Sequence, residues 1–339
     1  MEVGCFTGGR STALESVPFH EVGNMLRGLL LLFIFLGMNA FAQNNVLREG
    51  EGYLQTPSGR IWYKIVGSGE RTPLLLLHGG PGFSTYYMEP LAALSRDRPV
   101  VFFDQLGSGR SDVTHDPDLW TIDNFVKELA FVRESLHLDE IYILGHSWGT
   151  QLAIEYMATN PSGVKGLVLA SPAINVPRWI EDNKILLKAM PADVYQSIEK
   201  HERDGTTDSP EYEEAMMVFY HQHISRSDPW SEDLQMAFET ANTALYGYMW
   251  GPADWTATGT LKDYDREDYL PKLTVPVLFT AGRYDEARPD TVAHFQSLVP
   301  GSKIAIFEKS GHLTMQDEPD EYNRIVGDFL NEVDARNGN

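Results

Sequence analysis

Residues 141–150 read Ile-Tyr-Ile-Leu-Gly-His-Ser-Trp-Gly-Thr, an apolar run that ends in Gly-x-Ser-x-Gly and continues into the helix-forming stretch Gln151–Thr159. A strand, a sharp turn that carries serine and a helix form the context in which a serine becomes an exposed nucleophile. The small residues Gly145 and Gly149 would let the strand and the helix approach each other closely enough to present the hydroxyl group. The pattern therefore predicts that Ser147 is a catalytic nucleophile at the edge of a sheet.

A serine hydroxyl is a weak nucleophile until a base takes its proton, and a third group has to orient that base. One apolar run precedes Asp285, and a second run, Lys303–Phe307, precedes His312. Because parallel strands end at one edge of a sheet, we expect both side chains to meet Ser147 there. The chain order Ser, Asp, His is that of α/β-hydrolases. The neighbouring Glu286 is the alternative acid, and Asp285 could instead cap the next helix.

A third segment, Leu74-Leu-Leu-Leu-His-Gly-Gly-Pro-Gly82, offers the groups that would stabilise an oxyanion. An oxyanion hole needs backbone N–H groups that point into the site, and glycines after a strand allow that approach. Gly79 or Gly80, together with the N–H of Trp148, would form the pair. A structural Gly-Pro turn would also explain this stretch.

Strands and helices alternate along most of the chain, after an opening hairpin predicted for Tyr53–Thr56 and Arg60–Val66. Between the fourth parallel strand and the next one, helical patterns replace this alternation for about a hundred residues. We therefore predict an α/β-hydrolase fold with a mostly parallel, doubly wound sheet built from residues 43–171 and 271–339. An inserted helical cap is expected at residues 172–270.

Five motifs in one chain are far more specific than any one of them. They are His78-Gly-Gly-Pro-Gly82, Asp104-Gln-Leu-Gly-Ser-Gly-Arg-Ser111, Gly145-His-Ser-Trp-Gly149, Gly251-Pro-Ala-Asp-Trp-Thr-Ala-Thr-Gly259 and Gly311-His-Leu-Thr314. Over Gly52–Leu330 the chain resembles the prolyl iminopeptidase family of α/β-hydrolases, which includes the tricorn-interacting aminopeptidases and the proline or L-amino-acid amide hydrolases. Thr150 and Asp254 depart from the family pattern, which carries Gly and Glu at these positions.

The resemblance implies a serine hydrolase that releases an N-terminal residue, preferably proline, through an acyl-enzyme, with no cofactor. It implies that Asp254 binds the substrate amine, although this residue could instead cap a turn. Trp250 and Trp255 flank Asp254 and could either line an apolar substrate pocket or belong to the core of the cap. No metal site is predicted, because no cluster of His, Asp or Glu has ligand spacing.

Three other functions are compatible with parts of this pattern. An amide hydrolase would share every catalytic residue and differ only in its leaving group. A secreted esterase or lactonase would use the same triad without needing a free amine. In a binding protein that kept the fold, the serine would be unreactive. This is the weakest alternative, because all the residues of the triad are present.

The 339-residue chain has a formal net charge of −21, which argues against binding to nucleic acid because phosphates would be repelled. The expected partner is a small peptide or amino-acid amide, and the sequence does not predict an oligomeric state.

The amino-terminal region has the anatomy of a secretory signal peptide over residues 25–42. Met25-Leu-Arg27 precedes an apolar run at 28–38, and Ala40-Phe-Ala42 is a small-x-small cleavage site. Residues 1–24, which hold the only cysteine, would be an upstream extension. We therefore predict an exported protein, periplasmic or secreted, with no stable membrane association after cleavage; a short uncleaved anchor is the alternative.

Overall fold

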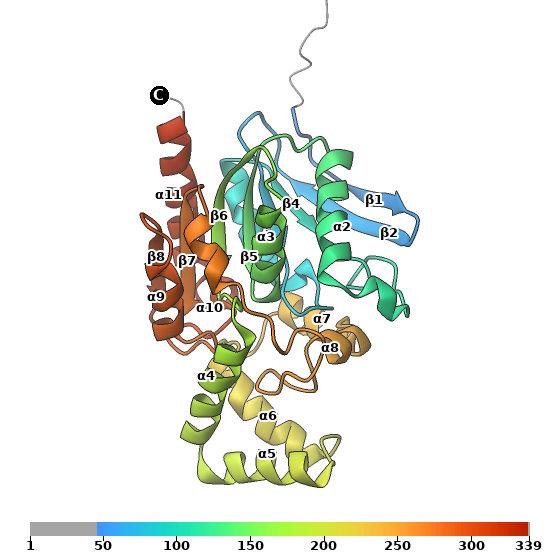
Figure 1. Cartoon of the computed structure of the whole chain (residues 1–339), viewed down its shortest axis with the longest axis vertical. Helices are drawn as coiled ribbons and strands as arrows, with labels where there is room; N and C mark the ends of the chain where they lie inside the picture. The colour runs from blue at the N-terminus through green and yellow to red at the C-terminus, as the bar shows by residue number, and fades with distance from the viewer. Residues whose placement is uncertain (1–45, 338–339) are drawn as a thin grey trace, which may run out of the picture. The chain divides into compact units, whose positions relative to one another are not determined.

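The computed structural model describes residues 46–337. The strands of this region form one eight-stranded sheet in the order β1-β2-β4-β3-β5-β6-β7-β8 (Figure 1). Strand β2 runs antiparallel to both of its neighbours, whereas every neighbouring pair from β4 to β8 is parallel. This arrangement confirms the predicted fold class. The strands are β1 (Gly50–Thr56), β2 (Gly59–Val66), β3 (Leu74–Leu77), β4 (Val100–Phe103), β5 (Ile141–His146), β6 (Val164–Ala170), β7 (Val277–Gly282) and β8 (Lys303–Phe307).

The central strands are apolar on both sides because both faces of the sheet are covered. Along β3, Leu75 and Leu77 join one core cluster, while Leu74 and Leu76 join the cluster on the opposite face. Helices α2 (Ile122–Ser135) and α3 (Trp148–Ala158) contribute to the first cluster. Segments η1 (Thr85–Arg96) and α11 (Pro319–Asn337) contribute to the second.

Five helices and a 3₁₀ segment lie in the chain between β6 and β7, and Figure 1 shows α5 at the end of the cap that is farthest from the sheet. Leu187, Ile198 and Phe219 form a separate apolar cluster within this cap. The elements are α4 (Val176–Ala189), α5 (Ala192–Asp204), α6 (Pro210–His223), α7 (Glu232–Glu239), α8 (Thr243–Met249) and η3 (Glu267–Lys272).

The cap contacts the core directly at the loop after β8. The backbone N–H of His312 donates to the carbonyl of His223 at 2.8 Å, and Leu313 donates to Ile224 at 2.8 Å. The carboxyl end of α6 therefore fixes the segment that carries the predicted catalytic histidine. Helix α9 (Pro289–Ser297) adds Val292 and Phe295 to the first core cluster, and α10 (Thr314–Asp317) adds Met315 to the second.

The predicted extension at residues 1–24 and the predicted signal peptide at 25–42 lie outside the described residues. Among residues 46–337, no helix has the length and apolar character needed to cross a membrane.

Candidate active site

The turn between β5 and α3 holds Ser147 in a backbone conformation that side chains rarely adopt, with φ 55° and ψ −122°. The flanking positions admit only glycine. A Cβ atom at Gly149 would lie 2.1 Å from the carbonyl oxygen of Leu77, and one at Gly145 would lie 2.4 Å from that of Gly149. The Ser147 N–H donates to the carbonyl of Ala170 at 2.9 Å. Close approach of strand and helix therefore fixes the serine at the end of the sheet, as the sequence predicts.

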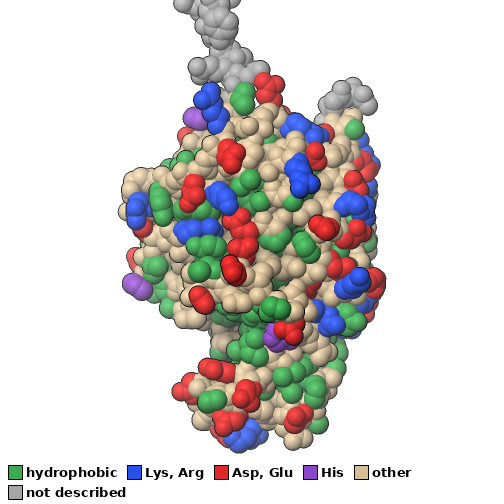
Figure 2. All heavy atoms as spheres, turned by 180° about the vertical axis from the view of Figure 1, so that it is seen from behind, with side chains coloured by type: hydrophobic (Ala, Val, Ile, Leu, Met, Phe, Trp, Pro, Cys, Tyr) green, Lys and Arg blue, Asp and Glu red, His purple; other side chains and the backbone are tan. Residues whose placement is uncertain are grey.

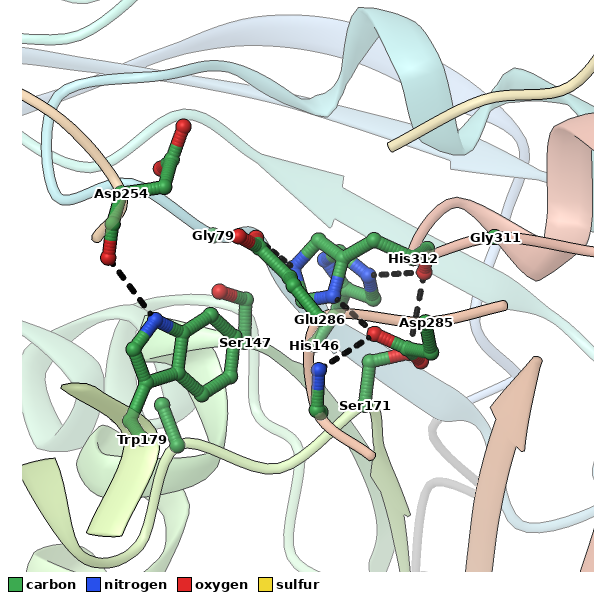
Figure 3. Close-up of polar contacts among 12 residues, drawn as sticks. Gly79, His146, Ser147, Ser171, Trp179, Asp254, Asp285, Glu286, Gly311 and His312 are labelled. Carbon is green, nitrogen blue, oxygen red and sulfur yellow. Dashed lines mark hydrogen bonds and ion pairs between the residues drawn. The ribbon is translucent and has the colours of Figure 1, made fainter. Parts of the chain in front are cut away.

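The other two predicted triad residues are joined by a hydrogen bond of 2.8 Å between His312 Nδ1 and Asp285 Oδ1 (Figure 3). Asp285 is 1% exposed and also accepts from the N–H of Ala287 at 2.8 Å and from Ser171 Oγ at 2.6 Å. Because a carboxylate can only accept here, Nδ1 carries the hydrogen and leaves Nε2 free to act as a base. Asp285 does not cap helix α9, whose N-cap residue is Arg288.

Ser147 and His312 line the same cavity, but the structure shows no hydrogen bond between Ser147 Oγ and another group of the described chain. His312 Nε2 lies instead 3.6 Å from Glu286 Oε1. Figure 3 shows His312 and Asp285 on one side of Ser147 and Asp254 on the other. Catalytic hydrogen bonds are commonly loose without substrate, so this geometry is compatible with a serine and histidine pair that tightens on binding.

The two glycines proposed for the oxyanion hole differ in the structure. The Gly79 N–H donates to Tyr87 Oη at 2.6 Å and is therefore occupied. The N–H groups of Gly80 and Trp148 make no such bond within residues 46–337, and Gly80 has a φ of 115° that favours glycine. Trp148 begins helix α3, whose positive end favours negative charge, and its ring N–H donates to Gln105. Gly80 and Trp148 are therefore the better pair.

The cavity in front of Ser147 has a volume of about 260 Å³. Phe83, Leu234 and Phe238 supply apolar walls, whereas Asp254 and Glu286 supply carboxyl groups. Among the residues described, no group of three or more His, Cys, Asp or Glu side chains could hold a metal ion.

Asp254 is held in the cavity wall by two tyrosine hydroxyls. Tyr246 Oη donates to Oδ1 at 2.6 Å, and Tyr220 Oη donates to Oδ2 at 2.7 Å. Burial and the charge of Asp254 raise the pKa of both tyrosines well above the usual value, so both hydroxyls remain donors. Trp179 Nε1 donates to the backbone carbonyl of Asp254 at 3.0 Å. These contacts orient the carboxylate.

Glu286 is a second buried acid at the same cavity, which the sequence suggested only as an alternative triad member. Its side chain is 2% exposed, and its Oε2 atom has no hydrogen-bond partner among residues 46–337. Burial, followed by the negative charges of Asp254 and Asp285, raises the pKa of Glu286 well above its usual value. The negative charges that help to raise this pKa would also attract a cation, and an ammonium beside Glu286 would favour its ionised form.

Comparison with known proteins agrees with this geometry. The profile of the alpha/beta hydrolase fold family matches residues 72–319. The proline iminopeptidase of Heyndrickxia coagulans is 45% identical over 84% of this chain and 99% of the relative, and that of Saccharolobus solfataricus is 35% identical over 90% and 98%. The crystal structure of the Mycobacterium smegmatis proline iminopeptidase matches with a TM-score of 0.79 and 31% identity, covering 85% of this chain and 99% of that one. The chain belongs to the proline iminopeptidase family of α/β-hydrolases. It is therefore a hydrolase of the aminopeptidase class.

Two aromatic residues predicted to bind substrate lie elsewhere in this family member. Trp250 is 3% exposed, and its ring N–H donates to the carbonyl of Ala253 at 3.1 Å. Trp255 is 2% exposed and packs on Phe219 with ring centroids 4.9 Å apart. Neither lines the cavity in front of Ser147. Trp250 packs on Trp179 within the core cluster on one face of the sheet, whereas Trp255 belongs to the separate cluster inside the cap.

Proposed function

We propose that this chain is a serine aminopeptidase that removes one N-terminal residue, preferably proline, from small peptides. The observation that carries the proposal is the presence of two acids, Asp254 and Glu286, in the cavity that contains Ser147. An enzyme that cleaves after one residue has to recognise a free amine at a fixed distance from the nucleophile. Carboxyl groups that form charge-assisted hydrogen bonds with an ammonium meet that need.

The proposed reaction proceeds through an acyl-enzyme. Ser147 Oγ attacks the carbonyl carbon while His312 Nε2 takes its proton, and Asp285 holds the imidazole in the required tautomer. The N–H groups of Gly80 and Trp148 stabilise the oxyanion. His312 then returns the proton to the leaving amine, which departs with the rest of the peptide. A water molecule, deprotonated by His312, releases the N-terminal residue from Ser147.

Two observations support the proposed preference for proline: the residues that line the cavity and the similarity of this chain to proline iminopeptidases. Phe83, Leu234 and Phe238 offer apolar surface beside the acids, which suits a compact ring attached to an ammonium. The relatives named above are themselves called proline iminopeptidases.

A panel of prolyl, alanyl and N-acetyl-prolyl aryl amides tests the amine requirement. We expect the prolyl amide to be turned over fastest and the acetylated compound to be inert, because acetylation removes the ammonium charge. Comparable turnover of the acetylated substrate would favour the esterase or lactonase alternative. Comparing Pro-Gly with prolinamide separates a peptidase from an amide hydrolase, since these differ only in the leaving group.

Replacement of the proposed nucleophile and base tests the chemistry itself. Ser147→Ala and His312→Ala should each lower kcat by several orders of magnitude, and the double variant should be little worse than either one because the two side chains act as a unit. A fluorophosphonate should label wild-type protein on Ser147. Near wild-type turnover in purified Ser147→Ala would exclude a serine mechanism.

We also propose that the protein is exported and begins near Gln43 after removal of a signal peptide. The charged start, apolar run and small-residue site at 25–42 support this proposal. Intact mass of the protein recovered from its host, outside the cytoplasm, should match a chain that lacks residues 1–42. A cytoplasmic chain that keeps residues 25–42 would contradict it.

A further inference from the structure

One chain of hydrogen bonds runs behind Ser147 and is not part of the proposed triad. The Gly79 N–H donates to Tyr87 Oη at 2.6 Å, and Tyr87 Oη lies 2.9 Å from His146 Nδ1. His146 Nε2 in turn lies 3.0 Å from the carbonyl oxygen of His312. Figure 3 shows His146 beside His312. These hydrogen bonds therefore link three parts of the site: the loop of Gly79 and Gly80, here called the oxyanion loop, the residue before Ser147, and the loop that carries His312.

The direction of every bond in this chain follows from its two ends. The carbonyl of His312 can only accept, so His146 Nε2 carries the hydrogen and Nδ1 is an acceptor. Nδ1 accordingly accepts the hydroxyl hydrogen of Tyr87, whose oxygen accepts from the Gly79 N–H. Burial, with the nearby His312, lowers the pKa of His146 well below its usual value, and burial raises that of Tyr87. Both side chains therefore stay neutral and keep this single arrangement.

The surroundings leave the two side chains little freedom. Tyr87 is 2% exposed and His146 1% exposed. The His146 ring packs on His312 with centroids 4.6 Å apart and on Tyr87 with centroids 5.2 Å apart. Gln316 of α10 donates to the backbone carbonyl of Tyr87 at 2.6 Å. Tyr87 and His146 are thus held from three elements: η1, the end of β5 and the segment after His312.

We infer that Tyr87 and His146 are positioning residues that hold the oxyanion loop and the His312 loop at the correct positions relative to Ser147. The inference rests on the proposed serine mechanism. By engaging the Gly79 N–H, Tyr87 fixes the peptide plane between His78 and Gly79, one residue before the Gly80 N–H that is left for the oxyanion. His146 connects that plane to the backbone of His312. Because a displacement of about 1 Å at a reacting group can cost about 100-fold in rate, this link bears on turnover more than on substrate affinity.

Tyr87→Phe removes one hydroxyl and keeps the ring. We expect kcat to fall about 10–100-fold while KM stays within about twofold. The displaced Gly80 N–H would stabilise the negative charge that develops in the transition state, which the bound substrate does not yet carry. Tyr142→Phe is the matched control: Tyr142 is 0% exposed, and its hydroxyl donates to Asp334 at 2.6 Å from a position five residues before Ser147. This control should keep the wild-type kcat. Tyr87→Phe with kcat within twofold of wild type would overturn the inference, as would an equal loss in Tyr142→Phe.

A second pair of variants tests the link through His146. Glutamine offers one acceptor and one donor, so His146→Gln should retain more activity than His146→Ala. Adding Tyr87→Phe to His146→Ala should lower kcat little further, because the chain is already broken. Fully additive losses, or equal activity of the Gln and Ala variants, would contradict a shared chain.

The same variants are measured with a fluorophosphonate and with a simple aryl ester, neither of which has a free amine. Slower labelling of Ser147 and slower ester turnover in Tyr87→Phe would support the inference even if the aminopeptidase proposal fails on peptides. Unchanged labelling and ester rates would exclude a positioning role.

Discussion

At the scale of single residues, the free amine of the substrate is the feature that separates an aminopeptidase from other serine hydrolases of this fold. Asp254 has a carboxylate whose two oxygens each accept a tyrosine hydroxyl, from Tyr246 and Tyr220. Glu286 has one oxygen atom that finds no hydrogen-bond partner in the described part of the chain. The two acids therefore differ: Asp254 is fixed in place before substrate arrives, whereas Glu286 lacks a partner that an ammonium would supply.

Asp254→Asn should lower kcat/KM for a prolyl aryl amide by roughly 10–150-fold, which corresponds to the loss of a charge-assisted hydrogen bond of about 1.5–3 kcal/mol. The amide can still bond to Tyr246 and Tyr220, so the fold is expected to persist. Turnover of an aryl ester without an amine should hardly change. The exposed Asp263→Asn serves as a control for charge alone. Equal loss on both substrates would indicate a defect of the cap instead, and no loss on either would remove Asp254 from the site.

At the scale of elements, the strands and the catalytic turn were predictable because their signals are local. Apolar runs bounded by Gly or Pro define β3, β4 and β8 with the residues observed, and the spacing of apolar residues defines α2. The placement of Asp285 and His312 followed from one rule, that parallel strands end at one edge of the sheet. Such inferences need only the order of elements along the chain.

Features that depend on contacts between distant segments were not predictable in this way. Sequence alone left Gly79 and Gly80 equivalent, because only the approach of Tyr87 shows which N–H is occupied. Trp250 and Trp255 lie close to Asp254 in the sequence, yet Trp250 packs into the core cluster on the sheet and Trp255 into the cluster inside the cap, and neither lines the cavity. Neighbours along an irregular segment can face in opposite directions, so adjacency to a site residue carries little information about a shared pocket.

The tight turn between β5 and α3 gives a prediction that compares two helical glycines, Gly149 and Gly247. Gly149→Ala places a Cβ atom 2.1 Å from the carbonyl of Leu77 and should destabilise the fold by several kcal/mol or prevent it, since backbone has to move. The Cβ atom of Gly247→Ala in α8 meets no described residue within 4 Å, so this variant should stabilise the fold by about 0.5–1 kcal/mol through helix propensity. Thermal unfolding of both variants measures the contrast. Similar stability of the two would mean that strand and helix are not in close contact at the nucleophile.

At the scale of the whole molecule, charge has to be considered together with pH. The chain carries a formal charge of −21, and on the face drawn in Figure 2 the basic side chains are interspersed with acidic ones. Outside the active site, one acid with a raised pKa lies in helix α2. Glu128 of α2 lines a cavity of about 320 Å³ and accepts from the Leu106 N–H at 3.0 Å. Burial raises the pKa of Glu128 to about 8.

This shift makes the stability of the whole fold depend on Glu128 between pH 4.5 and about 8. Below pH 4.5 the Glu128 carboxyl group is protonated in both the native and the unfolded chain, so Glu128 does not change the free energy of unfolding. Between these values the unfolded chain ionises while the native chain does not, so the free energy of unfolding falls as pH rises. Glutamine accepts from the Leu106 N–H but cannot ionise. Glu128→Gln should therefore gain stability over wild type as pH rises from 5 to 8, by about 2–4 kcal/mol.

Thermal unfolding of wild type and variant across this range gives the test, with Glu134→Gln as the control because Glu134 is exposed on the same helix. The Tm difference between Glu128→Gln and wild type should widen with pH, while the difference for Glu134→Gln should stay flat. Parallel curves for both variants would mean that Glu128 is already ionised at pH 5 in the folded chain. The cavity beside α2 would then be well hydrated, because only water or a cation could keep that carboxylate charged there.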